Sequence, residues 1–372
     1  MSAVRSPVPS GSPAAWLPVL VGARHHSLPL AALERGWKQL QRRVGVTNPF
    51  LSWEWQSAWA AQLPRGVAPV VVAQPFPDGS LAGLLALQWR RHQGLAQLEF
   101  LGEGSGGDDL DCLLDPRAPA GTAERLLAAA LRQRRWQRLR LESADAGGAL
   151  AQLPWVRTEA AEWLPTLELP ASFDAYLAAQ SPNFRAEIRR RRRRFVRQWP
   201  QARLDCAAAP AAVAAALPHL FRLHNLRRTQ HAAAGIFESP RLRAFHLRAA
   251  PGLAALGVAR VYLLRTPETI LAVLYGLEAG PAGARRFLYF QSGFDPAATA
   301  FSPGTVLLSA VIEDCMARGL RSFDFLRGEE GYKARWTSAR HSSLRLLAVR
   351  GAVGTAWLRL REGWHWMRSR KP

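Results

Sequence analysis

The last third of the chain holds a group of side chains that could carry out group transfer. Residues 323–328 read Phe-Asp-Phe-Leu-Arg-Gly and are predicted to form a strand that ends in a short polar loop. The titratable members of this segment are Asp324, Arg327, Glu329, Glu330, Tyr332 and Lys333. A carboxylate can remove a proton from a nucleophile, a tyrosine can return one to a leaving group, and cations can bind phosphate or an acidic substrate.

A predicted helix start lies shortly before this segment. Ser302 and Pro303 precede Gly304 and Thr305, and proline suits the first turn of a helix. The first backbone amides of a helix have no partner inside the helix, so they bind anions readily. A helix start of this kind beside a titratable loop predicts a transferase that uses a phosphorylated donor.

The elements that must position these residues follow the same order in both halves of the chain. In each half, strands lead to Asp-Pro, then to a loop with Gly-Thr, a leucine-rich helix and a further strand. The two copies lie about 180 residues apart, and such self-similarity indicates a structural repeat. The predicted strands cover 67–73, 81–89, 95–101, 111–114, 138–141, 258–265, 269–278, 285–293 and 321–326, and the two helices cover 122–134 and 303–318.

We therefore predict an α/β (α+β) fold of two similar halves, each a mixed central sheet flanked by helices. The halves are expected at 29–165 and 166–348, after a Ser/Pro/Gly/Ala-rich disordered leader at 1–28. The tail at 349–372 combines tryptophans with arginines, which suits either a membrane interface or packing on the domain. No apolar run approaches the roughly 20 residues that a membrane-spanning helix needs.

Composition and charge narrow the function classes. The formal net charge is +21, from 49 Lys+Arg against 28 Asp+Glu, which favours anionic partners such as CoA, nucleic acid, anionic lipid or acidic glycan. Hydrophobic residues make up 48% of the chain, which argues against wholesale disorder. The three cysteines are far apart without a CxxC pair, so we predict no disulfide framework and no metal. We expect a cytoplasmic protein, either free or peripheral at the inner membrane face.

A predicted helix over 171–200 carries six consecutive arginines at 189–194. Ser181 followed by Pro182 fits an N-cap and the first helical turn. Six adjacent arginines surround a helix on every side, and like charges four residues apart repel one another. The helix is therefore expected to need an anionic partner or tight packing of its apolar residues.

Two histidines lie on a further predicted helical stretch. His224 and His231 are seven residues apart, about two helical turns, so they share a face near Arg228. This is not the spacing of a helical metal-binding pair, which is four residues. They are either surface histidines or residues of a substrate groove.

The order of these motifs resembles that of GNAT-superfamily acyltransferases of the polysaccharide-biosynthesis (CelD-like) type, over roughly residues 45–345. The matching segments are 48–55, 107–116, 181–185, 294–304 and 323–336, of which the last is the most specific. The resemblance implies tandem GNAT halves, as in Fem-type peptidoglycan aminoacyltransferases, and an acyl donor that is usually acyl-CoA, with its pyrophosphate at 301–306. The usual Arg/Gln-x-x-Gly-x-Gly loop is replaced here by Ser-Pro-Gly-Thr, which leaves aminoacyl-tRNA, the donor of Fem-type relatives, open.

We predict a bacterial GNAT-type N- or O-acyltransferase that moves an acetyl or other acyl group from acyl-CoA to an amine or hydroxyl of a small-molecule or glycan acceptor. The predicted catalytic residues are Asp324, Glu329, Tyr332 and Lys333; the donor-binding residues are Ser302, Gly304, Thr305 and Arg327; the substrate-binding residues are His224, Arg228, Arg185 and Trp336. Asp324 is either the group that orients or deprotonates the acceptor or a structural carboxylate.

Two other functions stay open at this point. The arginine run and the net charge favour a Fem-like aminoacyl-tRNA-dependent transferase, because each arginine that neutralises a phosphate releases counterions. The missing glycine loop favours a degenerate GNAT scaffold of a polysaccharide synthase complex, docked on an anionic membrane through its tail.

Overall fold

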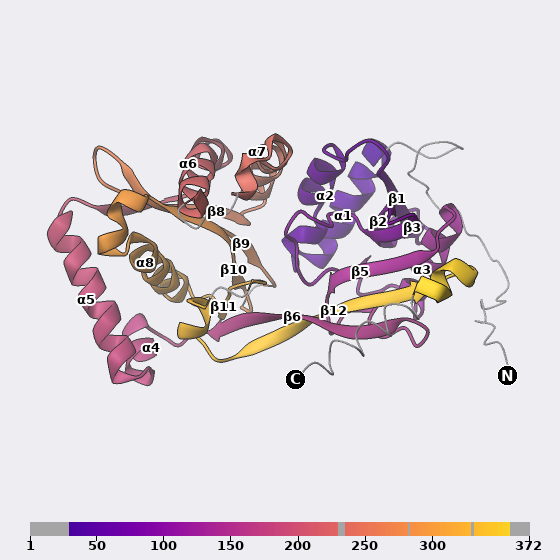
Figure 1. Ribbon diagram of the computed structural model, residues 1–372. Coiled ribbons are helices and arrows are strands. Elements are labelled where there is room, and N and C mark those ends of the chain that lie inside the picture. Colours follow the sequence, from indigo (N-terminus) through magenta and orange to yellow (C-terminus); the bar gives the residue numbers. More distant parts are fainter. Residues whose placement is uncertain (1–29, 230–234, 282, 329–330, 358–372) are drawn as a thin grey trace, which may run out of the picture. The chain divides into compact units, whose positions relative to one another are not determined.

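The protein is described by a computed structural model that covers residues 30–229, 235–281, 283–328 and 331–357 (Figure 1). The predicted leader and most of the predicted tail lie outside these residues. The chain forms two compact units, each built from separate stretches of sequence, whereas the predicted halves are continuous. Unit 1 contains Met1–Val44, Leu63–Ala161 and Ser343–Pro372, and unit 2 contains Gly45–Gln62 and Glu162–Ser342.

Unit 1 is built on a mixed sheet with the strand order β1-β2-β3-β5-β12. Strands β3 and β5 are parallel, the other neighbours are antiparallel, and the short β4 pairs with β2. The strands are β1 Ala68–Pro75, β2 Leu81–His92, β3 Leu95–Phe100, β4 Leu113–Leu114, β5 Arg138–Ala144 and β12 Arg340–Val349. The helices are η1 Leu30–Leu33, α1 Glu34–Val44 and α3 Thr122–Gln133.

Local polar contacts form the turn between the first two strands. Asp78 Oδ1 accepts hydrogen bonds from the Ser80 amide at 2.9 Å and from the Ser80 hydroxyl at 2.7 Å. Gly79 has a φ of 80°, a conformation that glycine adopts without steric cost. This local chemistry closes the hairpin of β1 and β2.

Unit 2 is built on a sheet with the order β6-β11-β10-β9-β8-β7. Only β10 and β11 are parallel among the pairs that the structure describes here. The strands are β6 Arg157–Glu168, β7 Arg203–Ala207, β8 Ala259–Arg265, β9 Ile270–Ala279, β10 Arg286–Phe294 and β11 Ser322–Asp324. Strands β6 and β12 each begin in one unit and end in the other.

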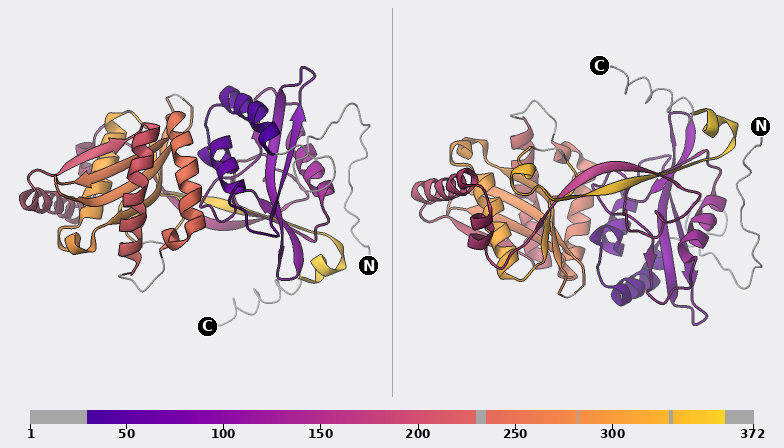
Figure 2. Two further views of the ribbon diagram at one scale, coloured as in Figure 1. Left: turned by 90° about the horizontal axis from the view of Figure 1, so that it is seen from above. Right: turned by 90° about the horizontal axis from the view of Figure 1, so that it is seen from below.

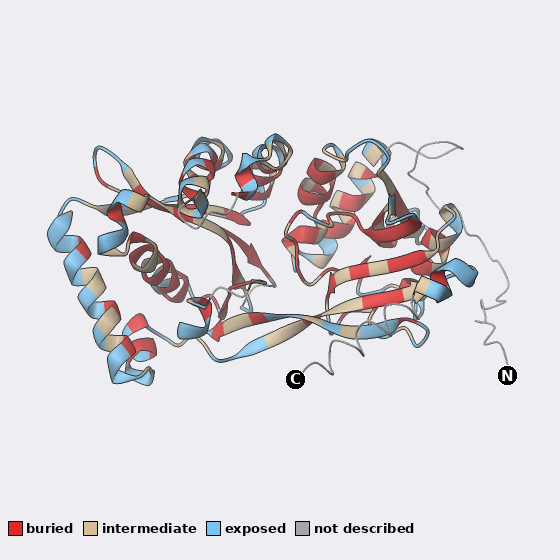
Figure 3. Cartoon of the chain, viewed as in Figure 1, coloured by how far each residue is buried: buried red, intermediate tan, exposed pale blue. Residues whose placement is uncertain are grey.

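Helices cover both faces of the unit 2 sheet. Helices α6 and α7 lie on one face, and α5 and α8 lie on the other (Figures 1 and 2). Strand β9 is buried along nearly its whole length (Figure 3), as expected for a strand that is covered on both sides. The helices are α2 Trp53–Ala60, α4 Phe173–Ala179, α5 Pro182–Gln198, α6 Pro210–Thr229, α7 Pro240–Ala255 and α8 Pro303–Ala317, with short helices η2 Pro49–Leu51, η3 Ile236–Glu238, η4 Pro296–Phe301 and η5 Lys333–Arg335.

Aromatic residues fill the core on the α6–α7 side of this sheet. Trp55 is fully buried, and its ring centroid lies 4.8 Å from that of Phe245 and 5.3 Å from that of Phe290. Edge-to-face geometry of this kind adds to the stabilisation from burial alone. These contacts explain why residues 45–62 belong to unit 2.

Two helices of unit 2 begin at serine caps, and the cap at Ser181 confirms the predicted helix start. Ser52 Oγ accepts from the Trp55 amide at 3.2 Å, and Ser181 Oγ accepts from the Phe184 amide at 3.3 Å. The prediction of one helix over 171–200 is wrong, because the chain forms α4 and then α5. Pro182 has no amide hydrogen and disfavours helical geometry in the residue before it, so the first helix ends there.

The repeated order of elements is also confirmed. Helix α3 connects the parallel strands β3 and β5, and α8 connects the parallel strands β10 and β11. Both helices follow a residue in the left-handed conformation, Gly121 with a φ of 74° and Ser302 with a φ of 55°. The fold is therefore mixed α/β, with a mixed sheet and flanking helices in each unit, as predicted.

Two observations bear on the membrane. None of the helices in the described ranges is long and apolar enough to span a bilayer. Trp357, the first tryptophan of the predicted tail, packs on Arg138, whose guanidinium carbon lies 4.4 Å from the ring centroid. The other tryptophans of the tail lie outside the described residues.

Candidate active site

The site of interest in unit 2 lies where two parallel strands part. Strands β10 and β11 pair only at residues 286–288 and 322–324, after which β11 ends while β10 continues to Phe294. An irregularity in the β9–β10 register between Tyr289 and Gln291 falls at the same level. Side chains beyond the carboxyl end of β11 therefore meet the second half of β10, which does not pair with β11. This is a usual location for ligand sites in α/β sheets.

A first pocket of about 190 Å³ opens in this place. Four structural elements and the segment after β11 contribute to its wall. The lining residues are Phe184, Glu187 and Ile188 of α5, Arg227 of α6, Tyr289, Ser292 and Phe294 of β10, Gly304, Thr305 and Leu308 of α8, and Tyr332, Arg335 and Trp336 of the segment that follows β11.

The start of α8 forms one end of this pocket. The amides of Thr305 and Val306 both donate to the Ser302 carbonyl, at 3.0 and 3.1 Å, whereas no such bond is made by the Gly304 amide among the described residues. A Cβ atom at Gly304 would lie 3.1 Å from Phe294 Cδ1, so glycine allows the strand and the helix to approach. Arg191 Nη1 donates to Ser302 Oγ at 2.7 Å, which adds a cation to the helix start.

A chain of hydroxyl groups crosses the pocket. The Tyr332 hydroxyl donates to the Tyr289 hydroxyl at 3.0 Å, and Tyr289 is hydrogen bonded in turn to Ser292 Oγ. Arg227 Nη1 also donates to Ser292 Oγ, at 3.4 Å, and the guanidinium lies 5.8 Å from the Tyr332 ring centroid. Tyr289, Ser292 and Arg227 are not among the predicted site residues, and the structure places them beside Tyr332.

A second pocket of about 100 Å³ adjoins the first and shares Arg227, Tyr289, Ser292 and Tyr332 with it. Its remaining lining residues are His224, Arg228, Phe290, Gln291, Arg327 and Lys333. Four predicted site residues are therefore found in this second pocket together with Tyr332.

His224 and Lys333 are held in this pocket by backbone carbonyls. His224 Nδ1 lies 3.0 Å from the Ser292 carbonyl oxygen, so Nδ1 carries the proton and Nε2 is the basic nitrogen of this tautomer. A Cβ at Gly293 would lie only 2.3 Å from the His224 backbone nitrogen, so glycine is required for α6 to lie this close to β10. Lys333 is buried, and its Nζ donates to the Arg327 carbonyl at 2.9 Å.

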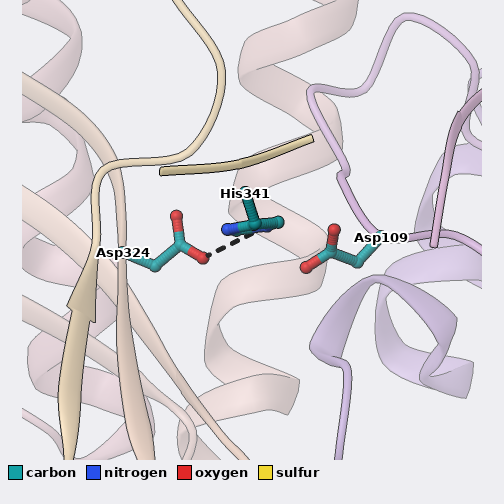
Figure 4. A group of neighbouring side chains, drawn as sticks. All are labelled: Asp109, Asp324 and His341. Atoms are coloured by element: carbon teal, nitrogen blue, oxygen red, sulfur yellow. Dashed lines mark ion pairs between the residues drawn. The ribbon is translucent and has the colours of Figure 1, made fainter. Parts of the chain in front are cut away.

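Asp324 lies beside the pockets rather than in their walls. The carboxylate is 1% exposed and accepts a hydrogen bond from the Leu326 amide at 2.8 Å. It also lies 3.5 Å from Arg286 Nη1. Figure 4 shows its contact with His341, whose Nε2 is 3.9 Å away. Leu326 has a φ of 53°, which is uncommon for a residue other than glycine. Because Asp324 accepts the Leu326 amide, it stabilises this conformation and with it the turn that leads to Tyr332.

Trp336 and Arg335 close the α5 side of the first pocket. The Trp336 ring lies nearly parallel to that of Tyr176, with centroids 6.3 Å apart, and its carbonyl accepts the Tyr176 hydroxyl at 2.7 Å. Arg335 forms an ion pair with Glu187. Burial alone would raise the pKa of Glu187, but hydrogen bonding and charge from Arg191 and Arg335 outweigh it, and the pKa lies below its ordinary value.

The remaining predicted residues have other positions. Arg185 lines neither pocket, and its Nη1 donates to the Ala178 carbonyl at 3.3 Å. Ser302 acts through its carbonyl and its bond to Arg191. Glu329 and Glu330 lie outside the described residues, so Glu329 stays a prediction.

Comparisons with known proteins agree with this fold. Residues 182–334 match the family profile described as acetyltransferase (GNAT) domain. FemX has a similar structure, with a TM-score of 0.57 at 10% identity over 87% of this chain and 98% of that one. L-PGS from Bacillus licheniformis has a TM-score of 0.54 at 11% identity over 87% and 94% of the two chains. No curated protein sequence matches the chain.

A conserved protein of unknown function from Bacteroides thetaiotaomicron is also similar, with a TM-score of 0.56 at 12% identity over 85% of this chain and 97% of that one. At such low identity these similarities establish the fold and nothing finer. The matched region contains both pockets apart from Arg335 and Trp336. Unit 2 therefore has a GNAT-like fold, residues 182–334 match a GNAT acetyltransferase profile, and the two pockets of this region are the candidate active site.

Proposed function

We propose that the protein transfers an acyl group, in the first instance acetyl, from acyl-CoA to an amine or hydroxyl of a sugar or polysaccharide precursor. One observation carries this proposal: the first pocket joins the start of α8 to a chain of hydroxyl groups at the point where β10 and β11 part. The start of α8 suits the phosphates of a phosphorylated donor. The hydroxyl chain suits proton transfer at the reacting carbonyl.

The residues at the start of α8 suit the phosphates of such a donor. The Gly304 amide, the helix dipole and Arg191 all favour negative charge at this place. The absence of a side chain at Gly304 lets a phosphate approach the backbone. In this proposal Ser302, Gly304 and Thr305 bind the donor, and Ser302 also holds Arg191 in position.

The hydroxyl chain suits the proton movements of acyl transfer. Acyl-CoA supplies an activated thioester carbonyl when it is bound. His224 Nε2 takes the proton of the attacking amine or hydroxyl, and the Tyr332 hydroxyl gives its proton to the departing sulfur. Tyr332 is hydrogen bonded to Tyr289, and Tyr289 to Ser292 Oγ, so the proton lost by Tyr332 can be replaced from these hydroxyls. His224 contacts Ser292 through the backbone carbonyl, so the base lies beside the hydroxyl chain and is not a member of it.

Asp324 and Lys333 act indirectly in this scheme. Asp324 fixes the turn at Leu326, and Lys333 fixes the carbonyl of Arg327, so both hold the segment that carries Tyr332. Trp336 supports the same segment through Tyr176. These are positioning roles, in contrast to the proton transfer assigned to Tyr332.

Calorimetric titration with acetyl-CoA tests the donor part of the proposal. The wild-type protein is expected to bind with micromolar affinity, and Gly304→Glu is expected to abolish binding because it sets a carboxylate against the phosphates. Gly304→Ala adds the Cβ without the charge. Ala300→Glu adds the same charge at an exposed position of η4 outside the pocket, so it should bind normally. Wild-type protein that does not bind acetyl-CoA would refute the proposal.

An aminoacyl-tRNA-dependent transferase is the second candidate, and helix α5 favours it. Arg189, Arg190, Arg193 and Arg197 are exposed there, in a protein with a net charge of +21. Binding to tRNA should then weaken steeply with salt, and replacing three of these arginines by glutamine should lower the slope of log K against log salt by about 2 to 3. Three matched replacements at Arg222, Arg243 and Arg248, which are exposed elsewhere in unit 2, should leave the slope unchanged if α5 is the contact.

A further inference from the structure

The second pocket differs from the first in its charge. Its wall contains four permanent cations, Arg227, Arg228, Arg327 and Lys333, and its other members, His224 among them, carry no fixed charge. In the part of the chain that the structure describes, no carboxylate lines it. In the first pocket, by contrast, Glu187 stands beside Arg335 and forms an ion pair with it.

These cations converge from two different elements, so their proximity is a property of the fold. Arg227 and Arg228 come from the last turn of α6, whereas Arg327 and Lys333 come from the segment after β11. Arg227 is held by Ser292 Oγ and lies against the rings of Phe294 and Tyr332, and Lys333 is held by the Arg327 carbonyl. Like charges brought together in a concave wall repel one another and produce a strong local positive potential.

The chemistry of these cations fits an oxyanion. Arginine presents a planar fork of donors that matches the oxygens of a carboxylate or a phosphate, and three of the four permanent charges here are arginines. The pocket volume of about 100 Å³ exceeds the roughly 15 Å³ that one water molecule requires, so a group of several heavy atoms can enter.

We propose that the second pocket binds an anionic oxygen group of the acceptor, a carboxylate or a phosphate, and that the acceptor is therefore acidic rather than a neutral sugar. This proposal rests on the proposed acyl transfer and names its substrate class. Since Arg227, Tyr289, Ser292 and Tyr332 line both pockets, an anion bound in the second pocket places an amine or hydroxyl of the same molecule at the hydroxyl chain.

Anion binding is measured first, by calorimetric titration with inorganic phosphate and with acetate at constant ionic strength set with sodium chloride. Wild type is expected to bind at least one probe, and the tighter of the two identifies the anion class. Arg228→Gln combined with Arg327→Gln is expected to weaken binding at least tenfold. The matched control, Arg222→Gln combined with Arg248→Gln, removes the same charge at exposed positions outside both pockets and should stay within twofold of wild type.

Two results of this titration would overturn the proposal. One is wild-type protein that binds neither phosphate nor acetate. The other is a control that loses as much affinity as the pocket variant, which would assign the effect to overall charge. Circular dichroism of each variant verifies that the fold is retained. If the double variant does not fold, a single Arg228→Gln variant, which changes only an exposed side chain, replaces it in the titration.

A second titration separates the acceptor anion from the phosphates of the donor. Protein saturated with acetyl-CoA is expected to bind the anion as the free protein does. If acetyl-CoA blocks the anion and acetyl-pantetheine, which lacks the nucleotide phosphates, does not, then the pocket serves the donor and the proposal is wrong. If acetyl-CoA does not bind at all, the proposed function is refuted instead. The anion titration still tests the second pocket in that case, because it does not require acetyl-CoA.

Turnover gives the final comparison, with glucosamine and glucosamine 6-phosphate as a matched pair of amine acceptors. The phosphorylated amine is expected to have a kcat/KM at least tenfold higher in wild type and in the Arg222/Arg248 control. The Arg228/Arg327 variant should lose that preference, mainly through KM. If the first titration shows that phosphate binds more tightly than acetate, the two amines should differ in kcat/KM. Equal kcat/KM values in wild type would then contradict the acceptor assignment.

Discussion

Gly293 of β10 lies directly beneath the backbone of α6, and this contact sets the position of His224 and Arg227. A Cβ added at residue 293 would lie 2.3 Å from the His224 nitrogen and 2.5 Å from the Leu223 carbonyl carbon, whereas ordinary contacts are 3.4–4 Å. Both clashing atoms belong to the backbone, so no side-chain rotation relieves the overlap. Gly293→Ala must therefore move α6 away from β10 by about 1 Å.

The expected cost is that of overpacking a close-packed interior, about 1–3 kcal/mol, and rigid backbone contacts put it near the upper end. For a unit of this size, a loss of about 3 kcal/mol lowers Tm by roughly 6–12 °C. The movement also lengthens the contacts of His224 and Arg227 with Ser292, so kcat/KM should fall by a larger factor than the affinity for acetyl-CoA.

Calorimetric melting and steady-state kinetics measure both effects. Gly331→Ala is the control, because an added methyl there meets nothing within 4 Å. The reasoning fails if Gly293→Ala melts within 2 °C of wild type, or if it loses stability while its kcat/KM matches that of Gly331→Ala.

Three further predictions concern the donor site, the hydroxyl chain and a buried histidine. Tyr332→Phe should lower kcat about 100-fold, the lower range for a general acid, while the calorimetric Kd for acetyl-CoA stays within threefold; unchanged kcat would exclude the acid role. Arg191→Gln should weaken acetyl-CoA binding about fivefold to tenfold, roughly 1–1.4 kcal/mol, whereas the exposed Arg197→Gln on the same helix should not. Burial lowers the pKa of His246 from 6.5 to about 3, so the unfolded chain takes up this proton first and stability falls as pH drops from about 6.5 toward 3, by up to about 1.4 kcal/mol per pH unit. Urea unfolding of His246→Phe should show a shallower loss over that window, and an unaltered slope would contradict the assignment.

Features that depend on neighbouring residues in sequence could be predicted from sequence alone. The caps at Ser52 and Ser181, the helix start at Gly304 and the polar segment around Tyr332 all follow from local rules of capping, proline geometry and turn composition. Because strand β11 precedes that segment, its proximity to α8 could also be expected from the β-α-β order.

Features that depend on contacts between distant segments could not be predicted in this way. Tyr289 and Ser292 resemble ordinary strand residues, and only the early end of β11 exposes them to a pocket. Strand β6 contains Pro165, which argues against a strand, and its pairing with β11 gives no local signal. Asp324 is a further case: the same carboxylate suits catalysis or a turn, and its hydrogen bond to Leu326 distinguishes the two.

The arginine run shows how the fold resolves a sequence that looks uniformly basic. Arg191 bonds to Ser302, Arg192 forms an ion pair with Glu313 at 2.6 Å, and Arg194 lies 5.0 Å from the Phe301 ring centroid. These three bind α5 to α8 and to the loop before it. The packing of Phe184, Ile188 and Phe195 in the core completes this attachment.

The interleaved composition of the two units has a consequence for biosynthesis. Unit 2 receives its last strand residues before Ser343 is made, whereas the β5 edge of unit 1 pairs with Leu344–Val349 of β12. A chain that ends before Leu344 therefore keeps the strands of unit 2 but leaves β5 without this partner. Its β5 edge then presents open amides and carbonyls, which is the type of surface that promotes aggregation. Expression of chains that stop before Leu344 should accordingly yield insoluble protein even though every strand of the GNAT-matched region is present.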